Sequence, residues 1–189
     1  MTVPFVHLRL HSEYSLVDGL VKLKSLVSTT AERRMPALAL TDEANLFGLV
    51  KFYKAAQGAG LKPIIGSDLW LSNPHDEAHP YRITLLAMND VGYRNLTELI
   101  SKGWTDGQRQ GRAILDKQWV LAQSEGLIAL SGGREGEIGR HLLSEHEREA
   151  RLKIARQLAR HLTHAPWTSQ GRVVDGSWTC PPGGGDAPA

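Results

Sequence analysis

The chain has 189 residues, of which 41% are hydrophobic and 22% charged, as is ordinary for a soluble globular protein. No apolar run reaches the roughly 18 residues that a membrane-spanning helix needs, and the stretch MTVPFVHLRLHSEY lacks the pattern of a signal peptide. A single cysteine, Cys180, excludes an internal disulfide and fits a reducing, cytoplasmic location. The formal net charge of +2 is too small to indicate nucleic-acid binding by itself.

Apolar runs and helix-spaced apolar residues alternate along the first part of the chain. The runs predict strands at 5–10, 37–40, 63–71, 83–88 and 127–130. The helical spacing predicts helices at 20–31, from 47 to near Gly58 or Gly60, and at 90–102, and a last helix that begins with a capping box of Ser144 and Glu147. This alternation favours an α/β fold with a mostly parallel sheet and outer helices, either an open doubly wound sheet or an incomplete β/α barrel.

The composition changes near the C-terminus. The stretch 164–189 is rich in Gly and Pro, ends in TCPPGGGDAPA and has no apolar periodicity. A segment of this kind cannot bury enough apolar surface to order itself. We therefore expect one domain over 1–163 and a disordered Gly/Pro-rich tail over 164–189.

In either α/β architecture, functional groups gather at the carboxyl ends of the strands. The polar residues that follow or end the first three predicted strands are Arg9, His11, Asp18, Asp42, Glu43 and Asp68. His7, Arg9 and His11 alternate, so they would project from one face of a strand. Carboxylates and a histidine in these places could form a metal or phosphate site. Alternatively, the carboxylates serve a turn or cap the next helix, as Asp42 and Asn45 would.

Two further motifs give weaker signals. The turn at 131–134 (SGGR) could hold an anion at the start of the next helix, although it lacks the spacing of a P-loop. The loop at 75–79 (HDEAH) contains metal-ligand residue types but not the helical H-E-x-x-H arrangement. For this loop we favour a solvated segment over a metal site.

Five segments carry a family resemblance, specific because their order and approximate spacing are kept: FVHLRLHSEYSLVDGL, MPALALTDEANLFGLVKFYKAA, LKPIIGSDLWL, LLAMNDVGYRNLTELISKG and EGLIALSGGREGEIGR. They resemble the N-terminal PHP (polymerase and histidinol phosphatase) domain of bacterial DNA polymerase III alpha subunits, from about Pro4 to about His161. The family fold is a distorted seven-stranded β/α barrel. The resemblance thus implies that this chain holds about the first half of such a barrel.

The same resemblance implies a degenerate metal site. Metal-binding members have His-x-His after the first strand, Asp-His after the second, Glu in the third, His opening the fourth and Cys in a Ser-Gly-Cys turn. The corresponding positions here are Arg9 and His11, Asp42 and Glu43, Asp68, Arg82 and Gly133, and Asp18 also remains of the ligand set. Arginine stays protonated and repels a cation. We therefore expect no bound metal, no other cofactor and no catalytic residue in this chain, with Arg9 paired to one or more of the carboxylates.

The function that the resemblance implies is that of a piece of a replicative DNA-directed DNA polymerase. The magnesium-dependent polymerase site of the family lies beyond this chain, so the piece itself would be a structural and docking module. Expected partners are a separate proofreading exonuclease subunit, which docks on the PHP domain, and the rest of the polymerase III holoenzyme. DNA is contacted by the parent protein, not clearly by this part, and no membrane is expected. The alternative is a free-standing metal-dependent PHP phosphoesterase, which needs a fuller His/Asp set.

Overall fold

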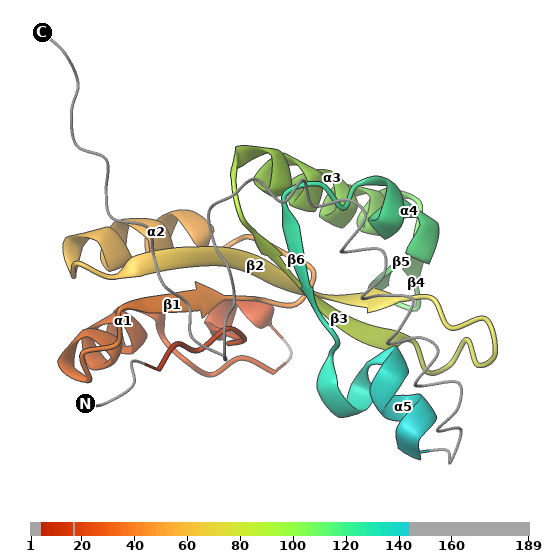
Figure 1. Cartoon of the computed structure of the whole chain (residues 1–189), viewed down its shortest axis with the longest axis horizontal. Coiled ribbons are helices and arrows are strands. Elements are labelled where there is room, and N and C mark those ends of the chain that lie inside the picture. The colour runs from red at the N-terminus through yellow and green to blue at the C-terminus, as the bar shows by residue number, and fades with distance from the viewer. Residues whose placement is uncertain (1–4, 17, 144–189) are drawn as a thin grey trace, which may run out of the picture. The chain divides into compact units, whose positions relative to one another are not determined.

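The structure, a computed structural model, describes residues 5–16 and 18–143 of the chain. Its strands are β1 Ala37–Leu40, β2 Lys62–Leu71, β3 Tyr81–Ala87, β4 Gln108–Arg109, β5 Arg112–Leu115 and β6 Leu127–Leu130 (Figure 1). Its α-helices are α1 Leu23–Glu32, α2 Leu49–Gly58, α3 Asp90–Thr105, α4 Lys117–Ala122 and α5 Glu137–Leu143. Two short 3-10 helices are η1 Glu13–Ser15 and η2 Gly133–Glu135. In this described part, no helix combines the length and apolar character needed to cross a membrane.

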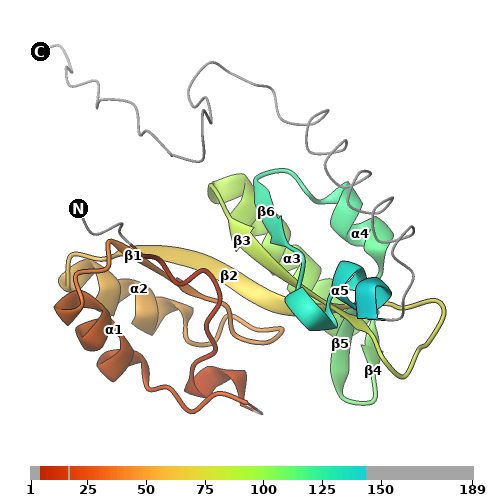
Figure 2. The same ribbon diagram turned by 60° about the horizontal axis from the view of Figure 1, so that its bottom comes forward.

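The long strand β2 organises the sheet. Its first half pairs in parallel with β1, from Ala37 opposite Lys62 to Leu40 opposite Ile65. Its second half pairs antiparallel with β3, and its last two residues also pair in parallel with β5. The strand order is β4-β5-β2-β3-β6, with β1 attached to β2. Figures 1 and 2 show β2 running from the side that carries α1 and α2 to the side that carries α3 and α4.

Gly66 lies where β2 changes partner from β1 to β3. A Cβ at this position would lie 2.6 Å from the carbonyl oxygen of Leu85 and 2.5 Å from a methyl carbon of Leu86. No side chain larger than hydrogen fits there without a shift of β3, since such contacts are far inside van der Waals distance. The glycine therefore lets β3 approach, and it places Asp68, two residues later, at the centre of the molecule.

Two apolar clusters hold the layers together. The first packs α1 and α2 on β1 and consists of Leu23, Val27, Leu38, Leu40, Phe52, Ala56 and Leu61. The second lies between α3, α4 and the rest of the sheet, and its fully or almost fully buried leucines are Leu69, Leu85, Leu96, Leu99 and Leu115. Burying a side chain of this size contributes about 1.5–3 kcal/mol. The candidate site lies around Asp68, on the second half of β2.

Most predicted elements are confirmed within a few residues, but the strand expected at 5–10 is absent. The segment makes one isolated parallel bridge, between His7 and Leu38. Its backbone does contact β1, because His7 and Leu10 accept hydrogen bonds from the N–H groups of Ala39 and Thr41. The N–H of Leu10, however, donates to the side-chain oxygen of Thr41 at 2.8 Å. That side-chain bond replaces a ladder bond, so the segment runs beside β1 without becoming a regular strand.

The expectation of a mostly parallel sheet is wrong, because β3 is antiparallel to both β2 and β6. The cause is the short connection at 72–80, which contains no helix, whereas a parallel pairing would need a crossover of a dozen or more residues. The sequence analysis also missed the β4–β5 hairpin and α4. The predicted helix with its capping box at Ser144 and Glu147, the boundary near 163 and the tail at 164–189 all lie outside the described residues.

Candidate functional site

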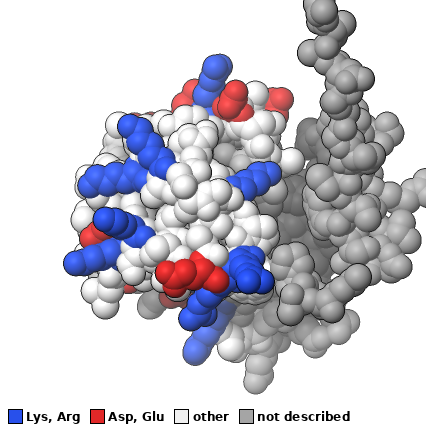
Figure 3. Space-filling model, turned by 90° about the vertical axis from the view of Figure 1, so that its left-hand side faces the viewer, with Lys and Arg blue, Asp and Glu red and all other residues white. Residues whose placement is uncertain are grey.

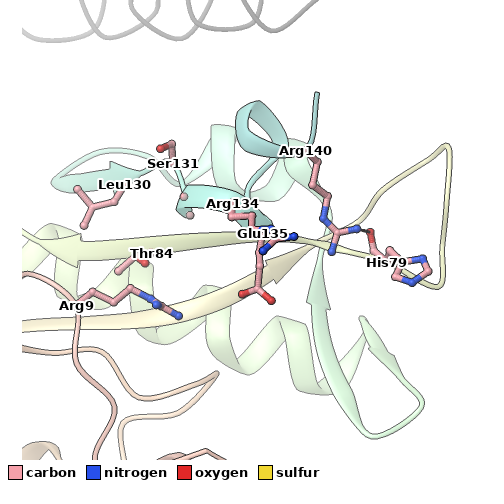
Figure 4. Close-up of a pocket in the computed structure, with 10 residues that line it drawn as sticks. Arg9, His79, Thr84, Leu130, Ser131, Arg134, Glu135 and Arg140 are labelled. Atoms are coloured by element: carbon pink, nitrogen blue, oxygen red, sulfur yellow. Dashed lines mark hydrogen bonds between the residues drawn. The ribbon is translucent and has the colours of Figure 1, made fainter. Parts of the chain in front are cut away.

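Asp68 is the centre of the candidate site and is fully buried. Its Oδ2 accepts hydrogen bonds from Arg9 Nε at 2.5 Å, His11 Nε2 at 2.7 Å and Arg82 Nη1 at 3.2 Å. Its Oδ1 accepts from the hydroxyl of Thr84, which lies directly opposite on β3. Figure 4 shows Arg9 and Thr84 in the same small region of the sheet. Both carboxylate oxygens are therefore occupied, and the predicted pairing of Arg9 with a carboxylate is confirmed for Asp68.

Arg82, opposite Trp70 on the neighbouring strand, links three acidic residues. Besides Asp68, its guanidinium contacts Glu43, with Nη2 3.5 Å from Oε2, and Glu135, with Nε 2.9 Å from Oε2. The contact with Glu135 is an ion pair whose angle falls outside hydrogen-bond geometry. The guanidinium lies 4.2 Å from the ring centre of Trp70, a cation–π contact. Glu43 in turn accepts a hydrogen bond from the indole N–H of Trp70 at 3.0 Å.

His11 lies between two carboxylates. Its Nε2 faces Asp68, and its Nδ1 lies 2.9 Å from both oxygens of Asp18. Burial disfavours the charged ring, but the hydrogen bonds and charges of Asp68 and Asp18 outweigh it and raise the pKa of His11 above 6.5. Burial likewise opposes ionisation of Asp68, but the hydrogen bonds from His11 and Thr84 and the charge of Arg9 hold the pKa of its carboxyl below 3.8. The two carboxylates therefore favour the protonated ring, in which both N–H groups can donate.

Asp42 stands apart from this network, although it is also buried. It accepts hydrogen bonds from the backbone N–H of Ser12 at 2.6 Å, the hydroxyl of Ser12 at 2.9 Å and the hydroxyl of Ser15 at 3.0 Å. The suggestion that Asp42 and Asn45 cap the next helix is wrong. The N-cap of α2 is Gly48, which receives no side-chain cap bond. Both residues instead fix the N-terminal segment, Asn45 by donating to the carbonyl of Tyr14.

An open pocket of about 750 Å³ adjoins the network. Its lining residues are Arg9, His79, Thr84, Leu130, Ser131, Gly132, Gly133, Arg134, Glu135 and Arg140 (Figure 4). Gly132 has φ +74°, and a Cβ there would lie 2.0 Å from the carbonyl oxygen of Arg82. This glycine lets the 131–134 turn pack on β3 and brings Glu135 to Arg82. An anion-binding role for the turn stays a prediction.

The structure brings most of the predicted site residues together and separates others. Arg9, His11, Asp18, Glu43, Asp68 and Arg82 form one network, which we call the Asp68 network, and Gly133 lines the adjoining pocket. His7 contacts the ring of Phe5 instead. The 75–79 loop is exposed, and Asp76 pairs with His79 there. That bond holds the pKa of Asp76 below its ordinary value.

Sequence reasoning missed Thr84, Trp70 and Glu135. Thr84 had a usable signal, because it lies two residues after Arg82 and therefore on the same face of a strand. Trp70 lies two residues after Asp68 and had the same signal. Glu135 had no sequence signal, because its contact with Arg82 depends on how the 131–134 turn packs on β3.

The donor set around Asp68 does not fit a metal ion. Among the residues that the structure describes, no group of three or more His, Cys, Asp or Glu is arranged to hold one. A cation beside Asp68 would face the guanidinium groups of Arg9 and Arg82, and neither group can lose its proton. The charge that a metal would supply is already provided by these two arginine side chains.

Comparisons with known proteins identify the family of the chain. The model of the PHP domain family matches residues 7–165, so the chain belongs to the PHP domain family. The chain is 57% identical over 150 residues to DNA polymerase III subunit alpha of Pseudomonas aeruginosa, and 51% identical over 139 residues to that of Escherichia coli. These matches cover 79% and 74% of this chain. The chain spans only 13% and 12% of the length of these two relatives.

A solved structure shows a more distant likeness. It is an amidohydrolase from Chromobacterium violaceum with bound sulfate and no metal. The identity is 23% and the TM-score 0.40, over 51% of this chain and 34% of the other. A likeness at this level has no bearing on the function of the site.

Proposed function

We propose that this chain is the N-terminal PHP part of the alpha subunit of DNA polymerase III, the replicative DNA-directed DNA polymerase, and serves there as a structural and docking module. The 57% identity over 150 residues supports the assignment to that subunit. The described sheet is then the first part of a PHP-type barrel. The Asp68 network stands where metal-binding members of the family hold their ions.

One observation carries the structural role: two arginines and a histidine converge on one buried carboxylate. Arg9 and His11 come from the N-terminal segment, Glu43 follows β1, and Asp68 and Arg82 lie on β2 and β3. The network thus ties four separate parts of the chain to one point. Such a cluster fixes the relative positions of these parts and leaves no open coordination position for chemistry.

The catalytic work of the parent protein lies elsewhere in this proposal. Nucleotide transfer needs carboxylates that hold two magnesium ions, and the relatives are long enough to carry that centre outside the matched part. The parent acts in the cytoplasm with the rest of the holoenzyme. Its proofreading exonuclease subunit is the partner that we expect on the PHP domain.

The test is whether the purified chain binds metal and turns over phosphoesters. We expect less than one zinc, manganese or magnesium ion per chain by elemental analysis after dialysis. We also expect no hydrolysis of p-nitrophenyl phosphate or single-stranded DNA with any of these ions. Two or more metals per chain, together with turnover that is lost in His11→Ala, would instead establish the free-standing phosphoesterase.

A further inference from the structure

The helical layer formed by α1 and α2 carries an unusual excess of positive charge. Between residues 22 and 62 the sequence contains seven Lys or Arg residues but only three Asp or Glu residues. Of the three acidic residues in this fully described stretch, Asp42 is buried and Glu43 is bound to Arg82 and Trp70, so only Glu32 is exposed. We call six exposed cations the basic surface: Lys22, Lys24, Arg33, Arg34, Lys54 and Lys62. The seventh, Lys51, donates to the hydroxyl of Tyr14.

The fold makes no use of these six cations. Within the part of the chain that the structure describes, Arg9, Arg82, Arg109 and Lys117 all form ion pairs, whereas no residue of the basic surface does. Arg33, Arg34 and Lys62 lie at the amino ends of β1 and β2, and the backbone N–H of Lys62 bonds to the carbonyl of Pro36. Figure 3 looks at this side of the described residues and shows more blue than red on it.

Arg34 offers a variant that removes charge without disturbing the backbone. It follows the C-cap of α1 with φ +56°, in the left-handed region, and Leu16, Ala44 and Gln110 also have positive φ at other places in the described chain. Glycine is the residue that normally fills this position of a helix end, because any Cβ is disfavoured there. Arg34→Gly therefore removes a cation from the basic surface at a place where glycine is easily accommodated.

Polar side chains accompany the cations of the basic surface. Ser25, Ser28, Thr29 and Gln57 are exposed on α1 and α2, and Val50 and Tyr53 of α2 are exposed as well. Lys, Arg, Ser, Thr and Gln are the side chains that contact the nucleic-acid backbone, whereas Lys and Ser are depleted in protein–protein interfaces. The ten residues of α1 extend over roughly 15 Å, so cations at its two ends can reach phosphates about four nucleotides apart.

We infer that the basic surface binds the phosphate backbone of nucleic acid, without reading its sequence. The surface lies on the α1–α2 layer, whereas the Asp68 network lies at the carboxyl ends of β1 and in the second half of β2. The inference therefore does not rest on the function proposed for that network. The affinity of the basic surface for nucleic acid comes from release of counterions from the phosphates. This affinity therefore falls steeply as the salt concentration rises.

The experiment measures binding of the full 189-residue chain to a fluorescein-labelled 25-base-pair duplex by anisotropy, over a series of salt concentrations. We expect Arg33→Gln/Lys62→Gln to weaken binding about tenfold at 100 mM salt and to make the plot of log affinity against log salt shallower by about 1.8. The control pair Arg94→Gln/Arg109→Gln removes the same charge from other exposed positions and should change the affinity less than about twofold.

A second variant separates binding from folding. Arg34→Gly should weaken binding while keeping or raising the melting temperature, because glycine suits the left-handed backbone at this position. The inference is overturned if the control pair loses as much affinity as the test pair, or if Arg34→Gly binds like the wild type. It is also overturned if poly-glutamate displaces the duplex as well as unlabelled duplex does, since the surface would then suit an acidic protein.

Discussion

The Nε of Arg9 lies 2.5 Å from Oδ2 of Asp68, and Nη1 of Arg82 lies 3.2 Å from the same oxygen. The two arginines reach this oxygen from different environments, because the side chain of Arg9 is 48% exposed and that of Arg82 only 8%. Water can replace much of what Arg9 contributes. It cannot replace Arg82, whose removal would take a charged donor from the buried Asp68 and the arginine partner from the partly buried Glu43.

This difference predicts a clear order of stabilities. We expect Arg82→Ala to lower the free energy of unfolding by about 3–5 kcal/mol, because Asp68 and Glu43 lose a buried partner. Arg9→Ala should lower it by only about 1 kcal/mol, since its pair is half exposed and Asp68 keeps three other donors. Urea denaturation measures both values, with Arg109→Ala as the control for an exposed pair. Equal losses from the two site variants would contradict the arrangement described here.

The titration of His11 and Asp68 predicts how stability depends on pH. The folded pKa of His11 is raised, so its contribution is complete below pH 6.5 and is lost as the pH rises through the folded value. The folded pKa of Asp68 is lowered, so its contribution is complete above pH 3.8 and is lost as the pH falls through the folded value. The contribution of these two groups to the free energy of unfolding should therefore be greatest between pH 3.8 and 6.5.

The variant His11→Gln tests this assignment. It should remove the decline of stability on the alkaline side, because no ring remains to lose a proton. The matched control is His75→Gln, in the exposed loop, which should keep the decline. Urea denaturation at a series of pH values gives the comparison. If the decline survives in His11→Gln, another group is responsible for it.

Much of the fold could be predicted because its elements have strong local signals. The helix at Asp90–Thr105 begins where the side chain of Asn89 accepts from the N–H of Gly92, a capping pattern that sequence can show. The β4–β5 hairpin was missed because its residues at 108–112 (QRQGR) are polar, and the burial of Ala113 and Leu115 depends on packing against α3. Local patterns do not contain that information.

The candidate site likewise contains some contacts that the sequence could predict and others that it could not. The pairing of Arg9 with a carboxylate could be predicted, because an arginine stood among histidine and acidic residues near the first strands, although the segment of Arg9 is not a strand and Asp68 lies inside β2. The isolation of Asp42 could not be predicted, because it depends on the N-terminal segment folding back so that Ser12 and Ser15 reach this carboxylate. The same holds for Glu135, which reaches Arg82 only through the close packing of Gly132 on β3.

Gly132 and Gly133 provide a matched pair for testing that packing. Both have positive φ, but a Cβ on Gly133 would meet nothing within 4 Å, whereas one on Gly132 would lie 2.0 Å from the carbonyl oxygen of Arg82. Gly133→Ala should therefore cost about 1–2 kcal/mol, the penalty of the left-handed backbone alone. Gly132→Ala should cost about 1–3 kcal/mol more, because the turn must move away from β3. Thermal or urea unfolding measures the difference, and a Gly132→Ala variant as stable as Gly133→Ala would show that the turn does not pack as described.

The last prediction concerns β6, which ends the sheet order and pairs with β3 alone among the described strands. Ile128, on β6, keeps 45% of its surface exposed. An apolar edge strand is a template for pairing with another chain, and a lysine on the edge prevents this. We expect the 189-residue chain to self-associate as its concentration rises and Ile128→Lys to reduce this association with little change in stability. Sedimentation velocity over a range of concentrations measures this association.

The control is Leu20→Lys, at a position that is 93% exposed but outside any strand, and it should leave association unchanged. If Leu20→Lys reduces association as much as Ile128→Lys does, general surface hydrophobicity and not the strand edge drives it.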